Sequence, residues 1–453
     1  MSIIITDIAV VGAGGCGLVA ALAAAEHGKR VILFEKEDRA GGNTAMSAGL
    51  AIAADSRLQR DGGEHGTPEE LAADIWSANH ATSDREVTLA LCRASGATID
   101  WMLDRGVPLE WMAGYRYPGH SRFWLHAPRE RHGEPIVRAL LSALEREPQV
   151  DLRLSTPVTK LMTDASGAVT GIQAGERLEI HARKVILAAD GFGANREMIA
   201  RFIPLFTQAI YYGAPGCTGD AINWGMQIGA ATAFMDSFQP HSSIAYPERI
   251  FVTTYIVNNG GIQVNRFGKR FSDETRGYAE HALAVQQQPG HVVYEIFDQR
   301  IRRSAEAGYA RFYECVDAGV IRPADTLAQL AMQLDIEPAT LAETVARYNS
   351  AVRIGKDEFG RTSFGEPLAA PFFAIPVTSA LFHTQGGLVV DPSARVLRPD
   401  GTVIPNLYAG GGTAAGFAGN GYGGYLGGVG LLSAFVLGKI AGEAAARSIT
   451  DER

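Results

Sequence analysis

A glycine motif between two predicted strands constrains the fold of this chain more than any other feature. Residues 3–11 are rich in isoleucine and valine and predict a buried strand, and a GxGxxG motif follows directly at residues 12–17. Residues 18–27 are rich in alanine and leucine, which predicts a helix, and residues 30–34 (RVILF) predict a second strand. Strand, glycine turn, helix and strand in this order predict a parallel βαβ unit.

The glycine motif is suited to holding a pyrophosphate. Gly12 permits the tight turn, Gly14 lets the backbone approach the phosphates, and Gly17 lets the helix pack closely. The N-terminus of the helix adds N–H donors and a positive potential. Glu35 lies 18 residues after Gly17, where its carboxylate can accept both hydrogen bonds from a ribose diol and would repel a 2′-phosphate. The segment therefore predicts a dinucleotide site.

A second glycine-rich segment, GGNTAMSAG at residues 41–49, bears on which dinucleotide is bound. Clustered glycine in a folded enzyme indicates backbone packed tightly against a ligand. A second glycine turn soon after the ribose acid suits a flavin protein, in which the chain runs back along the pyrophosphate and the ribityl group. A simple NAD dehydrogenase does not need such a turn, so the sequence favours FAD over NAD.

Composition and charge argue against several other classes of protein. Lysine and arginine number 41 and aspartate and glutamate 49, so the net charge is −8, and no basic cluster suggests binding to nucleic acid or anionic lipid. The four cysteines lie far apart without CxxC spacing, which argues against zinc, iron–sulfur and c-type haem sites and fits reduced thiols. With no secretory signal and no apolar run of ~18 residues, we expect a cytoplasmic protein without a membrane span. The oligomeric state is left open.

The rest of the chain shows both apolar periodicities. Strands are predicted at residues 150–171 around a turn, at 184–188, at 244–264 and at 407–409. Helices are predicted at residues 68–104, 135–146, 337–353 and 431–447. Residues 114–132 are irregular, and the proline-rich residues 365–376 look like the exit from a domain.

Motifs along almost the whole chain resemble the superfamily of FAD-dependent fumarate reductases and 3-ketosteroid Δ1-dehydrogenases. They are VVGAGGCG at 10–17, VILFEK at 31–36, GGNTAMSAG at 41–49, VILAADGFGAN at 185–195, GCTGD at 216–220, GGIQVNRFGKRFSDE at 260–274, HTQGGLVVD at 383–391 and NLYAGGG at 406–412. The resemblance implies an α/β fold, in which a Rossmann-like FAD-binding domain of the glutathione reductase type carries an inserted α+β capping domain. The FAD-binding domain would comprise residues 1–239 and 381–453, and the capping or substrate domain residues 240–380.

The resemblance also implies which residues contact FAD. Gly12, Ala13, Gly14 and Gly17 would face the pyrophosphate and Glu35 the ribose, while Asn43 and Thr44 would follow the ribityl and flavin. The backbone of Val158 would reach the adenine, Asp220 the flavin region, and Gly411 and Gly412 the ribityl chain. The remaining candidates come from the same motifs: Lys36, Gly42, Ser47, Gly49, Ala188, Gly191, Gly387 and Gly427.

The chain departs from the family pattern at three cofactor positions. Many relatives carry glutamate where this chain has Gly412, and the usual ATGG is here AADG at residues 188–191. In the respiratory relatives a histidine carries covalent FAD, and the matching position is Asn43. We therefore expect noncovalent FAD.

The family moves a hydride between flavin N5 and the carbon β to a carbonyl or carboxyl group, and a proton at the α carbon. His241 and His383 match two histidines that hold a substrate carboxylate in soluble fumarate reductases. Other fumarate reductase features are missing. Tyr425 stands where an arginine clamps the carboxylate, Arg276 lies two residues short of the spacing for the proton-donating arginine, and the upstream Glu-x-x-Arg relay reads TYIV at residues 254–257.

The 3-ketosteroid dehydrogenase pattern fits better. Tyr278 has that family's spacing from the Arg-Phe pair to a catalytic tyrosine, and it would exchange the α proton. Either Tyr422 or Tyr425, with an N–H of Gly427 or Gly428, would hold the ketone oxygen as an oxyanion hole. The spacing does not choose between the two tyrosines. Four side chains of the irregular segment are further candidates to line the pocket: Tyr115, Arg116, Tyr117 and Arg122.

These residues favour an FAD-dependent oxidoreductase acting on CH–CH bonds next to a carbonyl. Its substrate would be a small-molecule ketone, such as a 3-ketosteroid or a smaller cyclic ketone, or in reverse an enone. Because the sequence has no cluster or haem motif, electrons would pass to or from an external acceptor or donor. The alternatives are a fumarate-reductase-like reductase of an unsaturated carboxylate and a flavoprotein electron-transfer subunit.

Overall fold

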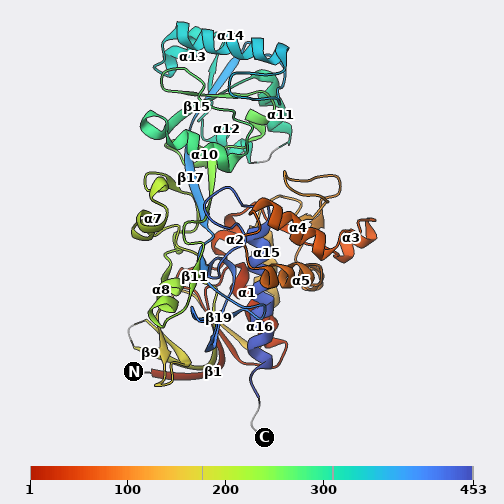
Figure 1. The fold of residues 1–453 in the computed structure, drawn as a ribbon, viewed down its shortest axis with the longest axis vertical. Coiled ribbons are helices and arrows are strands. Elements are labelled where there is room, and N and C mark those ends of the chain that lie inside the picture. Colours follow the sequence, from red (N-terminus) through yellow and green to blue (C-terminus); the bar gives the residue numbers. More distant parts are fainter. Residues whose placement is uncertain (1, 176, 309–310, 451–453) are drawn as a thin grey trace. The chain divides into compact units, whose positions relative to one another are not determined.

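The computed structural model describes residues 2–175, 177–308 and 311–450 (Figure 1). The chain forms two compact units. Unit 1 consists of Met1–Pro204, Gly213–Phe238 and His383–Arg453, and unit 2 of Leu205–Tyr212 and Gln239–Phe382. Unit 2 therefore interrupts unit 1 in the sequence.

A largely parallel sheet organises unit 1, with strands in the order β19-β20-β9-β1-β2-β6. These strands are β1 (Ser2–Val11), β2 (Val31–Phe34), β6 (Val150–Arg153), β9 (Leu178–Leu187), β19 (Arg395–Leu397) and β20 (Val403–Ala409). Val11 pairs with Phe34 and with Leu187, and Leu187 pairs with Ala409, so four parallel strands end at one edge of the sheet. The loops that follow these strands therefore meet there, which is where α/β sheets bind ligands.

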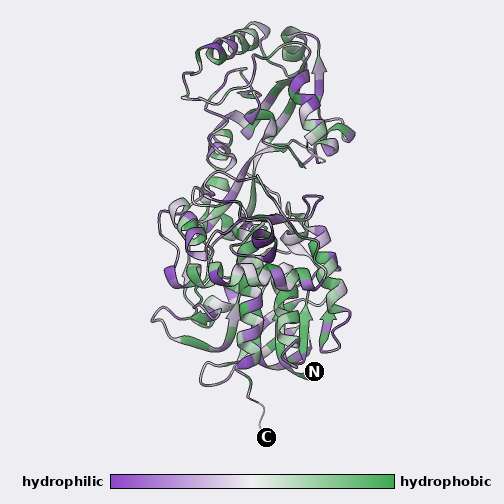
Figure 2. Cartoon of the chain, turned by 90° about the vertical axis from the view of Figure 1, so that its right-hand side faces the viewer, coloured by the Kyte–Doolittle hydropathy of each residue, from purple (hydrophilic) through white to green (hydrophobic). Residues whose placement is uncertain are grey.

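Helix α1 (Gly15–Ala25) lies between β1 and β2 in the sequence, and every residue of it is buried. It packs against α16 (Gly438–Arg447). A Cβ on Gly438 would lie 2.5 Å from the carbonyl oxygen of Cys16, and one on Gly442 would lie 2.3 Å from that of Ala20. The absence of side chains at these two positions brings the helices together. Figure 2 colours the chain by hydropathy, and the strands and helices carry many hydrophobic residues.

Smaller elements complete unit 1. The strands β7 (Val158–Thr163) and β8 (Val169–Ala174) form an antiparallel extension on β9, β3 (Ala51–Ile52), β4 (Glu110–Trp111) and β5 (Leu125–Ala127) form a second sheet, and β11 (Thr232–Ala233) pairs with β18 (Gly387–Leu388). The remaining helices are α2 (Gly42–Met46), α3 (Arg57–Asp61), α4 (Pro68–Ala78), α5 (Arg85–Asp104), α6 (Glu134–Leu144), α7 (Arg196–Phe202), α8 (Asp220–Gln227) and α15 (Val429–Leu432).

Unit 2 is built on a second sheet in the order β13-β12-β17-β15-β14, and β10 and β16 also pair with β17. Its strands are β10 (Ile210–Tyr211), β12 (Phe238–Ala245), β13 (Ile250–Phe251), β14 (Ile262–Asn265), β15 (Val292–Asp298), β16 (Arg322–Ala324) and β17 (Phe372–Thr384). Its helices are α9 (Tyr255–Asn258), α10 (Tyr278–Gln286), α11 (Gln299–Gly308), α12 (Phe312–Asp317), α13 (Leu327–Gln333) and α14 (Pro338–Ile354). One apolar core joins these strands and helices.

A buried ion cluster fixes the KRFSDE segment of unit 2. Arg270 donates to both carboxylate oxygens of Glu274 at 2.8 Å and to Asp357 at 2.7 Å. The completely buried Arg361 donates to Glu274 at 2.9 Å and to three backbone carbonyls. Because every charge in the cluster is paired, this segment has a structural role, and removal of one partner would leave an uncompensated buried charge.

One prediction of secondary structure was wrong in part, because residues 244–264 contain helix α9 as well as strands. The helices predicted at residues 68–104 are α4 and α5, which are separated where His80 and Ala81 adopt positive φ and the Asp84 side chain caps α5. The proline-rich residues 365–376 include the start of β17.

The C-terminal helix bears on the expectation of no membrane span. Within the described residues, one helix, Val429–Arg447, is long and apolar enough to cross a membrane by length and composition. This property is weak evidence, because 67% of its apolar window is buried inside the protein and the core helices of other proteins pass the same test. The search for an uninterrupted apolar run of ~18 residues did not select this helix, because charged residues interrupt its apolar sequence.

Glu295 should make the stability of the chain depend on pH. It is completely buried on β15 opposite Gln263, and burial raises its pKa to about 8. Since the folded-state pKa lies above that of the unfolded chain, its contribution to stability is full below pH ~4.5 and is lost as the pH rises toward 8. We expect Glu295→Gln to gain stability relative to the wild type by up to about 1.4 kcal/mol per pH unit between pH 5 and 8, measured by urea unfolding.

The matched control is Glu343→Gln on α14, an exposed position. It should track the wild type at every pH. A Glu295→Gln variant whose unfolding free energy changes with pH in parallel with the wild type would contradict the assignment.

Candidate functional site

A cavity lies in unit 1 at the edge where the parallel strands end. The loops after β1, β2, β9 and β20 all contribute to its wall. The predicted cofactor residues that line it are Gly12, Gly14, Glu35, Lys36, Gly42, Asn43, Thr44, Val158, Ala188, Asp220, Gly411 and Gly412. Sequence reasoning missed further lining residues, among them Cys16, Thr156, Asp190, Ala214, Cys217, Trp224 and Ala434.

The glycines of the first loop have two different reasons to be glycine. A Cβ on Gly12, which has a φ of +100°, would lie 2.4 Å from the carbonyl oxygen of Ala188, and one on Gly17 would lie 1.8 Å from that of Gly12. These two positions therefore serve close packing. A Cβ on Gly14 or Gly42 would meet no atom closer than 3.8 Å, so both face open space.

That open space fits a pyrophosphate. It lies at the N-terminus of α1, where Gly14 supplies no side-chain cap and the first turn has no acidic residue. The backbone N–H groups and the positive end of the helix are therefore available to an anion. The donor set and the missing side chains both fit the phosphate groups of a dinucleotide.

Glu35 is held at the end of β2 with its carboxylate in the cavity wall. Its Oε2 accepts from the N–H of Ala13 at 2.9 Å, and its Oε1 accepts from the N–H of Glu37 at 3.0 Å. The neighbouring Lys36 donates to Asp220 at 2.8 Å and to Thr218 at 2.6 Å. The sequence analysis assigned Asp220 to the flavin region. In the structure Asp220 forms an ion pair with Lys36, which follows Glu35, the residue predicted to bind the ribose.

Asn43 joins three segments of the cavity wall. Its side-chain amide donates to Asp190 Oδ2 at 2.9 Å, and its Oδ1 accepts from the N–H of Ala214 at 2.7 Å. The Thr44 hydroxyl accepts from the N–H of Gly15 at 3.2 Å and so ties α2 to the start of α1. Both side chains are therefore fixed before any ligand is considered.

The other predicted cofactor residues shape the wall without lining it. The Ser47 hydroxyl binds backbone groups of Thr44 and Gly49. A Cβ on Gly49 would lie 2.8 Å from the carbonyl oxygen of His132. A Cβ on Gly191 would lie 2.1 Å from the Thr384 hydroxyl oxygen, and one on Gly387 would lie 2.5 Å from the carbonyl oxygen of Thr413. These glycines therefore allow close packing behind the wall.

Beside the C-terminal motifs, His383 and Tyr425 form a polar pair with ring centroids 5.4 Å apart. Gln385 donates to His383 Nδ1 at 2.7 Å, which leaves the proton of the neutral ring on Nε2. The N–H of Gly430 donates to the Tyr425 oxygen at 3.4 Å. Removal from water lowers the pKa of His383 and raises that of Tyr425 to about 12, so both are neutral near pH 7.

The structure separates the two tyrosines that the spacing left open. Tyr425 lies beside His383, whereas the ring of Tyr422 lies 6.1 Å from that of Phe238. A Cβ on Gly427 would lie 3.0 Å from the Tyr117 ring, and one on Gly428 would lie 2.8 Å from Ile52. These glycines therefore serve packing around the tyrosine.

The irregular segment reaches this pair through Tyr117 and His120. Tyr117 contributes to the raised pKa of Tyr425, and His120 Nε2 lies 3.0 Å from the carbonyl oxygen of Gly427. Sequence reasoning missed His120, which has no motif around it. Two arginines of the segment have protein partners: Arg122 pairs with Glu64 and Glu70, and Arg116 donates to the Ser121 carbonyl.

In unit 2, the structure brings His241 and Tyr278 together. The His241 ring stacks on Phe382 at 4.9 Å and on Tyr278 at 5.2 Å, and burial lowers the pKa of His241 to about 3. The Tyr278 hydroxyl, at the start of α10, accepts from Gln239 Nε2 at 3.1 Å. Arg276, two residues earlier, is exposed.

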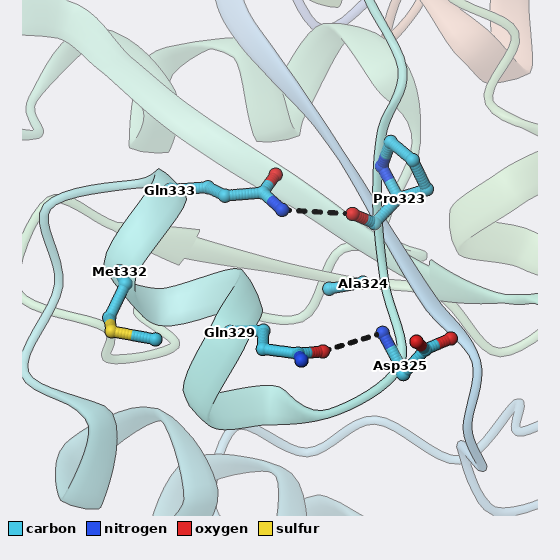
Figure 3. Close-up of a pocket in the computed structure, with 6 residues that line it drawn as sticks. All are labelled: Pro323, Ala324, Asp325, Gln329, Met332 and Gln333. Atoms are coloured by element: carbon cyan, nitrogen blue, oxygen red, sulfur yellow. Dashed lines mark hydrogen bonds between the residues drawn. The ribbon is translucent and has the colours of Figure 1, made fainter.

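A second cavity, on unit 2, is lined by Pro323, Ala324, Asp325, Gln329, Met332 and Gln333 (Figure 3). Its two amides are occupied with protein groups: Gln333 donates to the Pro323 carbonyl at 2.9 Å, and Gln329 accepts from the Asp325 N–H at 3.1 Å. Both bonds tie α13 to the segment that contains β16. The lining offers no acid–base pair, so the glycine-rich cavity of unit 1 is the better candidate site.

Comparison with known proteins agrees with this geometry. The family model for the FAD binding domain matches residues 7–430. The chain is 33% identical over 452 residues to a fumarate reductase (cytochrome) of Shewanella frigidimarina, covering 97% of this chain and 77% of the relative. It is similar to the open conformation of a flavocytochrome c3 fumarate reductase, with a TM-score of 0.87, 29% identity and coverage of 98% and 78%.

The fold is also shared with 3-ketosteroid Δ1-dehydrogenase from Sterolibacterium denitrificans. That structure has a TM-score of 0.81 and 23% identity, and the match covers 98% of this chain and 100% of the other. The predicted fold class and the predicted FAD cofactor are confirmed. The glycine-rich cavity is accordingly the candidate FAD site.

Glu35→Ala should weaken FAD binding. The variant loses a carboxylate that can accept two hydrogen bonds from the adenosine ribose, and bonds to a charged acceptor are worth about 1.5–3 kcal/mol each. We expect the dissociation constant for FAD to rise at least ~10-fold in a fluorescence titration of the deflavinated chain. Glu145→Ala, at an exposed position after α6, is the control, and equal affinities of the two variants would refute the role of Glu35.

FAD should leave the protein on denaturation. By its resemblance to the family, the chain has Asn43 where the respiratory relatives carry the histidine that attaches FAD, and an amide offers no such attachment. After acid precipitation, we expect the flavin absorbance in the supernatant. Yellow colour that stays with the washed pellet would contradict noncovalent binding.

Proposed function

We propose that this chain, which belongs to the FAD binding domain family and is an FAD-dependent oxidoreductase, adds or removes hydrogen across a carbon–carbon bond next to an uncharged carbonyl group. The substrate class is a ketone, such as a 3-ketosteroid or a smaller cyclic ketone, or the corresponding enone. An external electron donor or acceptor completes the cycle.

The neutral pair of His383 and Tyr425 carries this proposal. Both side chains present a proton near pH 7, on Nε2 of His383 and on the Tyr425 hydroxyl, and both are partly exposed. A carbonyl oxygen accepts two hydrogen bonds and gains negative charge as the α carbon loses its proton. Donors fixed in advance stabilise that charge most effectively.

Neighbouring groups hold the two donors in place. The Gly430 N–H fixes the Tyr425 oxygen, and Gln385 fixes the tautomer of His383. Support of this kind allows a donor to act without reorganisation. Bound FAD supplies acceptance and donation of a hydride. We assign the α proton to Tyr278 on its sequence context, and its hydroxyl oxygen accepts from Gln239 Nε2 at 3.1 Å.

The side chains around Tyr425 fit a carbonyl better than a dicarboxylate. A dicarboxylate would be held by arginine, which binds carboxylates through two parallel hydrogen bonds. Tyr425 itself is neutral, and Arg116 and Arg122 of the neighbouring segment are occupied by protein groups. Neither Arg116 nor Arg122 therefore offers the pair of His383 and Tyr425 a buried positive charge for binding a carboxylate.

The second candidate is reduction of an unsaturated carboxylate. Its support is the similarity to the fumarate reductase of Shewanella frigidimarina over nearly the whole chain. Exposed Arg276 beside Tyr278 would be the source of positive charge in that case. The two candidates predict different substrates for the same FAD site.

An anaerobic substrate panel separates the two candidates. Saturated 3-ketosteroids, cyclohexanones, 4-oxocyclohexanecarboxylate and succinate are added to the oxidised holoenzyme, and bleaching of the visible flavin band is followed. The proposal expects a ketone to bleach the flavin and succinate to leave it unchanged. If no compound bleaches it, reoxidation of the reduced enzyme by an enone supports the reverse reaction, whereas reoxidation by fumarate alone refutes the proposal.

Tyr425→Phe tests the donor directly. Loss of one oxyanion donor lowers catalytic rates by ~10²–10³, and we expect this loss in kcat for the best substrate of the panel. Tyr422→Phe is the matched comparison and should lose little. Equal losses in both variants would contradict the assignment of Tyr425.

A further inference from the structure

Asp190 is a charged residue in the FAD cavity that no motif assigned. It lies just after β9 in the AADG segment and lines the cavity. Its φ is +60°, a conformation that residues with a side chain seldom adopt. Glycine would adopt it without strain, so the side chain itself needs an explanation.

The carboxylate of Asp190 is held in one orientation. Its Oδ1 accepts from the N–H of Gly191 at 2.8 Å, and its Oδ2 accepts from Asn43 Nδ2 at 2.9 Å. Each carboxylate oxygen accepts two hydrogen bonds, so one site on each remains for a ligand. Among the described residues, no arginine or lysine forms an ion pair with Asp190.

The order of the strands places Asp190 relative to the parts of FAD. The sheet runs β20-β9-β1-β2, so Glu35 after β2 and Asp190 after β9 flank the glycine loop after β1. Neighbouring strands lie about 4.8 Å apart. In FAD the pyrophosphate is likewise flanked by two hydroxyl-bearing groups, the adenosine ribose on one side and the ribityl chain on the other. Glu35 suits the ribose, which leaves the ribityl chain to Asp190.

Charge supports the same choice. A carboxylate repels the pyrophosphate and attracts hydroxyl donors, so it cannot serve the phosphates. We propose that Asp190 is a cofactor-positioning residue whose carboxylate accepts a hydrogen bond from a ribityl hydroxyl of FAD. This inference rests on the FAD site and is independent of the substrate proposed above.

Position 412 shares the space of this carboxylate. A Cβ on Gly412 would lie 2.1 Å from Asp190 Oδ1 and 3.0 Å from the N–H nitrogen of Gly191. A side chain at 412 and a carboxylate at 190 therefore exclude each other. The glycine at 412 is a consequence of the acid at 190, and the two departures from the family pattern are one exchange.

Binding of FAD and of ADP to the full-length deflavinated chain tests the proposal by calorimetry. ADP contains the adenosine and pyrophosphate and lacks the ribityl chain. Asp190→Gly should weaken FAD about 10- to 100-fold and leave the affinity for ADP unchanged, while its apo form keeps the wild-type melting temperature. Unchanged FAD affinity, or an equal loss for both ligands, would overturn the proposal. Glu35→Ala is the contrasting variant, because it should weaken both ligands.

A double-mutant cycle gives the second measurement. Gly412→Ala alone should weaken FAD, because its methyl group meets the Asp190 carboxylate. The same substitution should cause no further loss in an Asp190→Gly background, and Asp190→Gly with Gly412→Glu should recover most of the affinity, because a carboxylate returns to the shared space. Strictly additive losses would show that the two positions are independent and would overturn the exchange.

Discussion

The close approach of the first glycine loop to the end of β9 is the contact on which the FAD site depends. A Cβ on Gly12 would lie 2.4 Å from the Ala188 carbonyl, so only glycine lets the loops after β1 and β9 meet. The same approach brings Asp190 to the cavity wall and lets Gly17 seat α1 against Gly12. The positions of helix α1 and of Asp190 therefore both depend on the backbone contact between Gly12 and Ala188.

Local signals predicted this half of the site well. The βαβ unit and Glu35 follow from periodicity and spacing within a short stretch of sequence, and the structure has the strands and the helix there. The roles of Asp190 and His120 depend on contacts between segments far apart in the chain, to Asn43 and to Gly427. Spacing also could not show that Tyr425 contacts His383, since these two residues lie far apart in the sequence. The short helix α9 was missed within a stretch of apolar residues, where periodicity carries little information.

Charge is distributed very differently around the two sets of candidate residues. In unit 2, Arg270 and Glu274 of the KRFSDE motif form a buried cluster with Arg361 and Asp357, in which the four charges neutralise each other. Arg270 is therefore unsuited to binding a free carboxylate. His383 and Tyr425 in unit 1 are neutral donors instead, and neutrality matters because a charged histidine would favour anionic ligands. The charged residues of this buried cluster thus stabilise the fold of unit 2, whereas His383 and Tyr425, which contact the substrate in our proposal, are uncharged.

Asp190 links the cofactor side of the site to this neutral pair. Its negative charge opposes the effect of burial on His383, so the two groups are coupled electrostatically although they share no hydrogen bond. Loss of the Asp190 charge would lower the pKa of His383 further and keep its ring neutral over a wider pH range. In our proposal the Asp190 carboxylate accepts from the ribityl chain, and its charge also limits how far burial lowers the pKa of His383. The pKa of His383 nevertheless stays below its ordinary value, so the ring remains a neutral donor near pH 7.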